Sequence, residues 1–451
     1  MASTKSEDRS PSAPPVAQRD VMGYGLAALN WLAGSAVLGR LGLRKQAEQA
    51  AYQASKSGFR VAGAASRGFS AARRLTKPAR LPAVSRSSDL FDLTPDDEQQ
   101  MIVATVVEFA AEQLRPDAAE ANENCAPGPG LLERVGELGI TVIGIPEQLG
   151  GVGTERSAVT NVLVTEALAY GDMGLAVSCL APSAVSTALV LWGDEHQQAT
   201  YLPSFVGDSV PAAALAVLEP RPLFDPFALQ TTARRSGAGF TLTGVKSMVP
   251  RAAECELFLV AAELDGDGPA LFLVESDSAG LRIEAEPAMG LRAASMGRVV
   301  LDDVQVPGGA QLGLPEAYPE CIRLARLAWC GLALGTSKAV LDYVIPYVNE
   351  REAFGEPISN RQGVAFKVAD MAIELEGMRL LTYRAASRAE QGKDFARDVA
   401  LARRLCGEKG MIIGTDGVQL LGGHGFVKEH PVERWYRDLR AVAMMEGIVL
   451  A

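Results

Sequence analysis

The C-terminal sequence RDLRAVAMMEGIVLA contains the carboxylate whose neighbours best suit it to chemistry. Glu446 follows two methionines and precedes Gly447. A carboxylate in apolar surroundings can serve as a general base, because desolvation raises its pKa toward neutrality. An acidic residue near a helix end is also commonly solvated and inert. By itself, the stretch therefore leaves two interpretations of Glu446, a working base and a solvated acid.

The other residues that bind metals or act as nucleophiles are scattered along the chain. The three histidines are His196, His424 and His430, and they form no cluster with metal-ligand spacing. The six cysteines include no CxxC pair. We therefore expect no metal site, and buried free thiols in a reducing, cytoplasmic compartment.

Length and charge bound the class of protein. The chain has 451 residues, of which 48% are hydrophobic and 22% charged, which is typical of about three globular domains. The net charge of −11 combines +10 over residues 1–86 with −21 over the rest. An acidic main body is a poor match for nucleic acid.

The basic N-terminal segment has two interpretations. A polar start is followed by 17 uncharged residues, 23–39, which are too few and too rich in Gly and Ala for a typical membrane span. Arg60, Arg67 and Arg74 then recur every seven residues, along one stripe of a predicted helix. This pattern suits peripheral contact of residues 20–80 with an anionic membrane, and equally a solvated helix face.

Beyond residue 86 the pattern predicts an α+β multidomain protein. Residues 87–208 are mainly helical, starting with Thr94 as the expected N-cap and Pro95 at the first helical position. Residues 209–312 contain five short β-rich runs separated by Gly, Asp and Pro, which indicates an antiparallel β domain. Residues 313–451 are helical again.

One C-terminal helix carries a clear amphipathic rhythm. The run FKVADMAIELEGMRLLTYRAA places apolar residues at near-helical spacing, at Phe366, Ala369, Ile373, Leu380 and Tyr383. Such spacing is typical of the face that a helix turns toward a protein core.

Five motifs in order resemble the acyl-CoA dehydrogenase family. REAFGEPISNRQGVAFKVADM and VQLLGGHGFVKEHPVERWYRDLR match its two most specific runs, and IPEQLGG, GLRAASMGRVVLDDVQVP and LARLAWCGLALG match three more. The resemblance covers about residues 93–451. It implies an N-terminal helical domain, a middle antiparallel β domain and a C-terminal four-helix-bundle-like domain. The basic extension and the short sequence after Gly447 mark a divergent member.

The resemblance also implies a reaction. Glu446 stands nine residues after Arg437, at the family's position for the base that removes the α-proton of an acyl-CoA thioester. The β-hydrogen would leave as hydride to N5 of FAD, with an electron-transfer flavoprotein as the final acceptor. Arg326, in LARLA, matches a family arginine near this loop, with a surface salt bridge as its alternative role.

The family builds its FAD site across a subunit interface. The resemblance assigns Arg351 and Phe354 to a neighbouring subunit's FAD, with Arg351 on the pyrophosphate. Gln419, Gly422 and Gly423 would contact the adenine end of the same cofactor, and Gln362 is a further contact of this group. This implies a homo- or hetero-oligomer of related subunits.

The chain's own half of the cofactor site departs from the family pattern. Leu218, Pro250 and Ile448 each replace a threonine, Met248 replaces a tryptophan, and two more departures remove hydroxyl groups, at Phe224 and Ala353. Each lost hydrogen bond costs on the order of 1 kcal/mol. By contrast, most groups donated to the neighbour's FAD are retained.

Three hypotheses follow. The chain is an active FAD-dependent acyl-CoA dehydrogenase that holds the cofactor unconventionally. Alternatively, it is the non-flavinylated subunit of a hetero-oligomer and completes a partner's FAD site. In the third hypothesis it is a catalytically silent relative used for docking.

Overall fold

The computed structural model describes residues 94–151, 156–207 and 209–451, which belong to one compact unit, Leu90–Ala451. The predicted basic element within residues 1–86 lies outside these residues. The description below starts at Thr94 and concerns this unit alone.

The first part of the described chain is helical, as predicted. Its α-helices are α4 (Asp97–Phe109), α5 (Arg115–Asn124), α6 (Leu131–Glu137), α7 (Ala158–Gly171), α8 (Met173–Trp192) and α9 (Glu195–Phe205), with a π-helical segment, η1 (Ala110–Leu114), between α4 and α5.

The start of α4 corrects the expected cap. The N-cap is Asp96 rather than Thr94, because the Asp96 carboxylate accepts from the Gln99 N–H at 2.8 Å and the Gln99 side chain accepts from the Asp96 N–H at 3.1 Å. This reciprocal capping box satisfies two backbone donors at once, which a single threonine hydroxyl at Thr94 would not do.

Helix α8 forms the centre of the helical layer. Among the described residues it is the one helix long and apolar enough to span a membrane by length and composition, yet 83% of its apolar window is buried inside the fold. Its N-cap Asp172 is also buried and pairs with Arg434, from Arg434 Nε to Asp172 Oδ2, at 2.9 Å. The hydrophobicity of α8 therefore serves the protein core and its end anchors the C-terminal helices.

The middle part forms one sheet. Its strands are β1 (Ala213–Ala216), β2 (Thr232–Ser236), β3 (Gly239–Val249), β4 (Leu257–Leu264), β5 (Gly268–Glu275), β6 (Leu281–Ala285), β7 (Gly297–Pro307) and β8 (Gln311–Leu312). The order is β6-β7-β3-β2-β4-β5-β8, and β1 pairs with β4.

The five predicted strands correspond to β3 through β7. Their pairings are antiparallel, with Gly239 opposite Pro307 in β3–β7 and Leu257 opposite Glu275 in β4–β5. Strands β1 and β2 were not predicted, because AALA and TARRS lack β-branched alternation; both pair with β4 in parallel. The sheet is thus mainly antiparallel with two parallel contacts.

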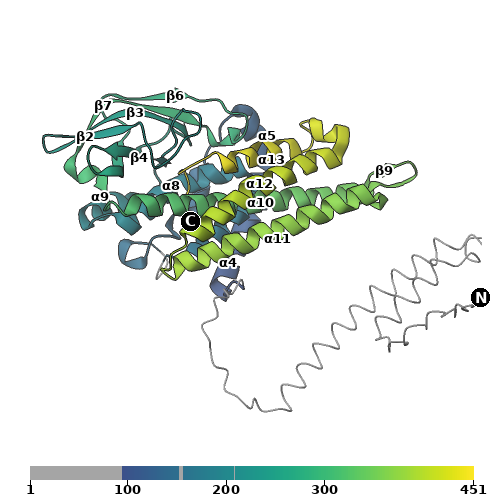
Figure 1. Ribbon diagram of the computed structural model, residues 1–451. Helices are drawn as coiled ribbons and strands as arrows, with labels where there is room; N and C mark the ends of the chain where they lie inside the picture. The colour runs from purple at the N-terminus through teal and green to yellow at the C-terminus, as the bar shows by residue number, and fades with distance from the viewer. Residues whose placement is uncertain (1–93, 152–155, 208) are drawn as a thin grey trace, which may run out of the picture. The chain divides into compact units, whose positions relative to one another are not determined.

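The C-terminal part is again helical. Its helices are α10 (Ala317–Glu350), α11 (Gln362–Glu390), α12 (Ala396–Leu421) and α13 (Val432–Leu439), with a hairpin of β9 (Glu352–Ala353) and β10 (Glu356–Pro357) after α10. At 1.5 Å per residue, the 34 residues of α10 extend about 50 Å. Figure 1 shows the sheet near one end of this helix and the β9 hairpin beyond the other.

The face that α11 turns inward matches the expected stripe at Tyr383, which is 6% exposed, but differs from it elsewhere. Phe366, Ile373 and Leu380 are 58%, 68% and 49% exposed, whereas the buried residues include Met371 and Met378. The helix carries apolar residues on two faces, so the spacing alone could not decide which face the chain buries. The α, β, α order and the fold class are nevertheless as predicted.

Candidate active site

Two side chains, one from each of two helices, hold the backbone of the loop that carries Glu446. The chain leaves α13, makes a short 3-10 turn, η8 (Arg440–Ala443), and then extends. Arg403 on α12 donates from Nη2 to the Met445 carbonyl. Trp329 on α10 donates from Nε1 to the Gly447 carbonyl at 3.0 Å. The residues on both sides of Glu446 are therefore anchored.

The Glu446 carboxylate itself pairs with Arg326. Arg326 Nε lies 3.0 Å from both carboxylate oxygens, and its Nη2 lies 2.8 Å from Oε1. Arg403 Nη2 is 3.9 Å from the same Oε1. Glu446 is only 8% exposed. The structure thus brings together the predicted base and the predicted loop arginine, and their contact is a bidentate, mostly buried pair rather than an isolated surface bridge.

A cavity of about 530 Å³ opens beside this pair. Its lining comes from α10, α12 and the loop after α13. We call it the arginine cavity, lined by Arg326, Ala400, Arg403, Arg404, Gly407, Glu408, Ala443 and Glu446. Glu446 therefore lines a cavity on the side of the loop that faces α12.

On its other side, the loop is packed against the sheet. Gly447 has φ +73°, and a Cβ there would lie 2.5 Å from Val217 Cγ2. Ile448 forms an antiparallel bridge with Leu215 of β1. The Ala451 N–H donates to the Leu324 carbonyl of α10 at 3.3 Å. The segment after Glu446 thus fills the space between β1 and α10, and only glycine fits at position 447.

Asp438 lies on α13, the helix that precedes this loop. It is buried, and its Oδ1 accepts from the Leu291 N–H at 2.6 Å. Burial, reinforced by the charge of Asp172, raises the pKa of Asp438 to about 7. Arg437 and Asp438, the RD pair of the sequence, therefore attach α13 to the segment that precedes β7.

At the chain's own cofactor positions, Leu218, Met248 and Pro250, two polar backbone atoms have partners inside the fold. The Leu218 carbonyl accepts from Ser247 N–H at 2.9 Å. The Met248 N–H donates to Glu286 Oε2 at 2.7 Å. Pro250 has no N–H to offer.

Glu286 shows how firmly this region is held. Burial alone would raise its pKa, but hydrogen bonds from Met248 N–H, Arg298 and Ser247 together lower it. The Met248 N–H, at one of the predicted cofactor positions, therefore already donates to an internal carboxylate.

The remaining cofactor candidates lie at the opposite end of α10. They share solvent exposure, and they are Arg351, Phe354, Gln362, Gln419, Gly422 and Gly423. Phe354 is 96% exposed, and a Cβ at Gly422 or Gly423 would meet nothing within 4 Å. In the part of the chain that is described, Arg351 makes no ion pair. An exposed cation, an aromatic ring and open glycines fit an anionic cofactor approaching from outside.

Tyr347, near the end of α10, connects this helix to the end of α12 and the turn that follows it. Its hydroxyl contacts the Leu421 carbonyl at 3.3 Å and His424 Nδ1 at 2.8 Å, one turn before Arg351. Arg351 lies 25 residues along the chain from Arg326, about 38 Å at the helical rise. The two groups of site residues therefore cannot meet at one flavin ring within one chain.

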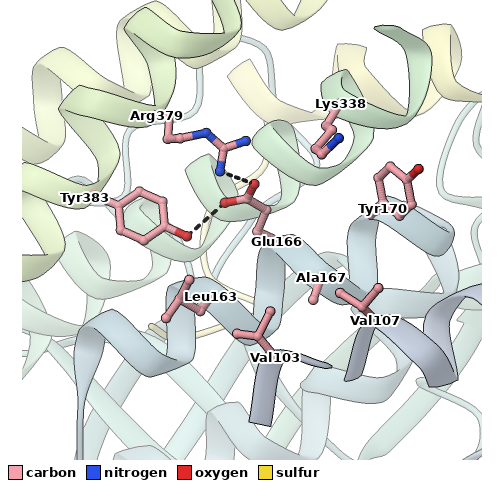
Figure 2. Close-up of a pocket in the computed structure, with 9 residues that line it drawn as sticks. All are labelled: Val103, Val107, Leu163, Glu166, Ala167, Tyr170, Lys338, Arg379 and Tyr383. Atoms are coloured by element: carbon pink, nitrogen blue, oxygen red, sulfur yellow. Dashed lines mark hydrogen bonds and ion pairs between the residues drawn. The ribbon is translucent and has the colours of Figure 1, made fainter. Parts of the chain in front are cut away.

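A second cavity, of about 350 Å³, lies between α4, α7, α10 and α11. Figure 2 shows Glu166 inside it, receiving Arg379 Nη1 at 2.5 Å and the Tyr383 hydroxyl at 2.9 Å. Lys338 pairs instead with Asp342 at 2.5 Å. The charged side chains that line this cavity, Glu166, Arg379 and Lys338, therefore each have an ion-pair partner. The cavity lies between packed helices and presents no unpaired reactive group among the described residues.

Sequence reasoning missed Trp329 and Arg403. Trp329 follows Arg326 by three residues on one helix, a spacing that places both on the same face. This spacing could have identified Trp329 as a neighbour of the site. Arg403 sits in LARRL, where nothing distinguishes it from its exposed neighbour Arg404.

Comparison with known protein families covers nearly all of the described chain. The model for the acyl-CoA dehydrogenase N-terminal domain matches residues 96–208, that for the middle domain residues 214–304, and that for the C-terminal domain residues 317–448. These intervals follow the α, β, α order of the fold.

Two curated relatives share about a third of their residues with this chain. The short/branched chain specific acyl-CoA dehydrogenase of Rattus norvegicus is 34% identical over 361 residues, covering 78% of this chain and 83% of the relative. The short-chain specific acyl-CoA dehydrogenase of Bos taurus is 32% identical over 377 residues, covering 82% and 90%.

Solved structures also resemble this chain in fold. Butyryl-CoA dehydrogenase from Megasphaera elsdenii superposes with a TM-score of 0.73 at 28% identity, over 79% of this chain and 96% of that one. PigA with FAD and proline gives 0.73 at 26% identity, with the same coverage. A chain from work on the electron transferring flavoprotein of Acidaminococcus fermentans gives 0.74 at 29%, again with the same coverage.

Proposed function

The chain belongs to the acyl-CoA dehydrogenase family, and from this premise we propose that it oxidises an acyl-CoA thioester, with Glu446 as the base that removes the α-proton. The observation that carries the proposal is the Glu446 loop, anchored through Met445, Gly447 and Arg326. A base must be held within hydrogen-bond reach of the proton it takes, and three long-range contacts supply that rigidity.

The Glu446 carboxylate retains the capacity to accept a proton. A carboxylate offers about four lone-pair sites, and Arg326 occupies three of them, two on Oε1 and one on Oε2. The remaining site is on Oε2. In this arrangement Arg326 fixes the carboxylate plane while Oε2 takes up the α-proton.

FAD would accept the β-hydrogen as hydride when bound. The distal residues Arg351, Gln419 and Gly423 suit its phosphate and adenine groups, whereas the Met248 N–H donates to Glu286 and Pro250 has no N–H. An oligomer in which each subunit lends its distal group to another is the assembly that suits this division. An electron-transfer flavoprotein is the proposed acceptor, in keeping with the structural neighbour from work on such a protein.

The test combines flavin content with turnover. The purified chain should show flavin absorption and reduce an artificial electron acceptor when given short-chain or branched acyl-CoA. Glu446→Gln should lower kcat by roughly 10²–10⁴-fold while flavin content stays constant. Glu408→Gln, which changes a more exposed carboxylate in the same cavity, is the matched control and should retain most activity. Unchanged turnover in Glu446→Gln would eliminate the base assignment.

A second candidate function has its own supporting observation. In the part of the chain that is described, the distal group is exposed and Arg351 makes no ion pair, while the Met248 N–H is engaged internally. This arrangement suits a non-flavinylated subunit that completes a partner's FAD site. Under this hypothesis the isolated chain is colourless, and flavin appears only when it is purified with a related flavin-binding chain. If no flavin binds in either preparation, the silent docking role is favoured instead.

A further inference from the structure

The arginine cavity carries more positive charge than its own carboxylates neutralise. Three arginines line it against two glutamates, Glu408 and Glu446. Across the described residues, Glu446 supplies the only carboxylate within 4.0 Å of Arg326 or Arg403. Two guanidinium groups therefore share one carboxylate.

Arg403 is the arginine with unused donors. Its side chain is 11% exposed, and its Nη2 donates to the Met445 carbonyl. Its Nη1 is buried and has no hydrogen-bond partner within the described chain. A buried, incompletely paired cation is costly. Burial correspondingly lowers the pKa of Arg403, although the Glu446 charge opposes this.

The shape of the cavity admits a ligand at this position. Its volume of about 530 Å³ exceeds what a few waters occupy, at roughly 30 Å³ each. Small residues form part of its wall, at Ala400, Gly407 and Ala443. Arg404, whose side chain is 83% exposed and lies 3.7 Å from Glu408, adds a third guanidinium to the lining. A planar or tetrahedral oxyanion matches such a set, because guanidinium groups bind carboxylate and phosphate through paired N–H donors.

We infer that the arginine cavity is an anion-binding site, which takes a carboxylate or phosphate oxyanion between Arg326 and Arg403. The anion pairs with the guanidinium group of Arg403, which lines the cavity, and competes with Glu446 for Arg326. Its source is either a free small anion or the phosphate of a larger ligand such as coenzyme A. The site does not depend on flavin chemistry, so it holds even if the proposed dehydrogenation does not.

The test is calorimetric titration of the full chain at constant ionic strength, with chloride as the balancing anion. Inorganic phosphate and acetate are the two probes. We expect one saturable site that Arg403→Gln weakens roughly tenfold or more, the loss of a charge-assisted hydrogen bond. Arg397→Gln, an exposed arginine on the same helix and outside the cavity, should bind as the wild type does.

A second variant keeps the test decisive if Arg403→Gln unfolds. Ala400→Phe fills the cavity without removing a charge or the Met445 contact, and should also weaken phosphate binding. Competition by coenzyme A would assign the site to an ester-borne phosphate, and its absence to a free anion. No saturable binding, or equal affinity in wild type, Arg403→Gln and Ala400→Phe, would overturn the inference.

Discussion

At the scale of single residues, position 447 determines where Glu446 points. Gly447 combines a left-handed φ of +73° with a close approach to Val217, the residue after β1, which leaves no room for a Cβ. Its carbonyl is also held by Trp329. Because Glu446 immediately precedes this contact, the anchored Gly447 backbone helps to hold the carboxylate beside Arg326.

Gly447→Ala should therefore destabilise the protein more than a left-handed glycine does elsewhere. The φ alone costs about 1–2 kcal/mol, and the new Cβ would lie 2.5 Å from Val217 Cγ2. Gly237→Ala is the control, since Gly237 has φ +58° and no atom within 4 Å of an added Cβ. Urea unfolding measures both. Equal losses in the two variants would show that the Val217 contact contributes nothing.

At the scale of elements, α13 connects the helical layer to the segment before β7 through two buried carboxylates. Asp172, at the start of α8, pairs with Arg434, and Asp438 binds the Leu291 N–H. Burial raises the pKa of Asp172 as well, against the opposing charge of Arg434. The contacts of α13 with α8 and with the segment before β7 are consequently sensitive to pH.

The sign of this sensitivity follows from the raised pKa. Between about pH 4 and pH 7 the folded state retains a proton on Asp438 that the unfolded state has released, so this contribution to stability is lost as pH rises through 7. Asp438→Asn should remove this fall, which amounts to at most roughly 4 kcal/mol. Asp265→Asn, at an exposed aspartate, should keep it. The measurement is the free energy of unfolding against pH, and identical slopes in both variants would contradict the assignment.

At the scale of the whole molecule, the site residues divide between the two ends of α10. Figure 1 shows the β9 hairpin, next to Arg351, beyond the end of the long helices remote from the sheet. The exposed apolar residues Phe366, Ile373 and Leu380 of α11 give the single chain a surface that suits burial by another subunit. Both features favour an assembly in which the distal group serves a neighbour.

Arg351→Met should then lower flavin occupancy of the assembly rather than its folding. Loss of one charge-assisted contact to a phosphate, worth about 1.5–3 kcal/mol, corresponds to roughly ten- to hundredfold weaker cofactor binding. Flavin stoichiometry by absorbance, with native mass, measures this. Arg234→Met, at an exposed arginine of β2, is the control. A flavin content unaffected by Arg351→Met would argue against the distal group as a cofactor site.

The sequence by itself determined the order of helices and strands, the strands β3 to β7, and the family through its motifs. These depend on local alternation and on residues close together in the chain. Only the tertiary structure decided that Arg326 and Glu446 pair across 120 residues, that Arg403 holds Met445, and that α11 leaves Phe366, Ile373 and Leu380 exposed. Such contacts arise from how helices pack, and periodicity cannot choose between two apolar faces or identify which arginine a fold will bury.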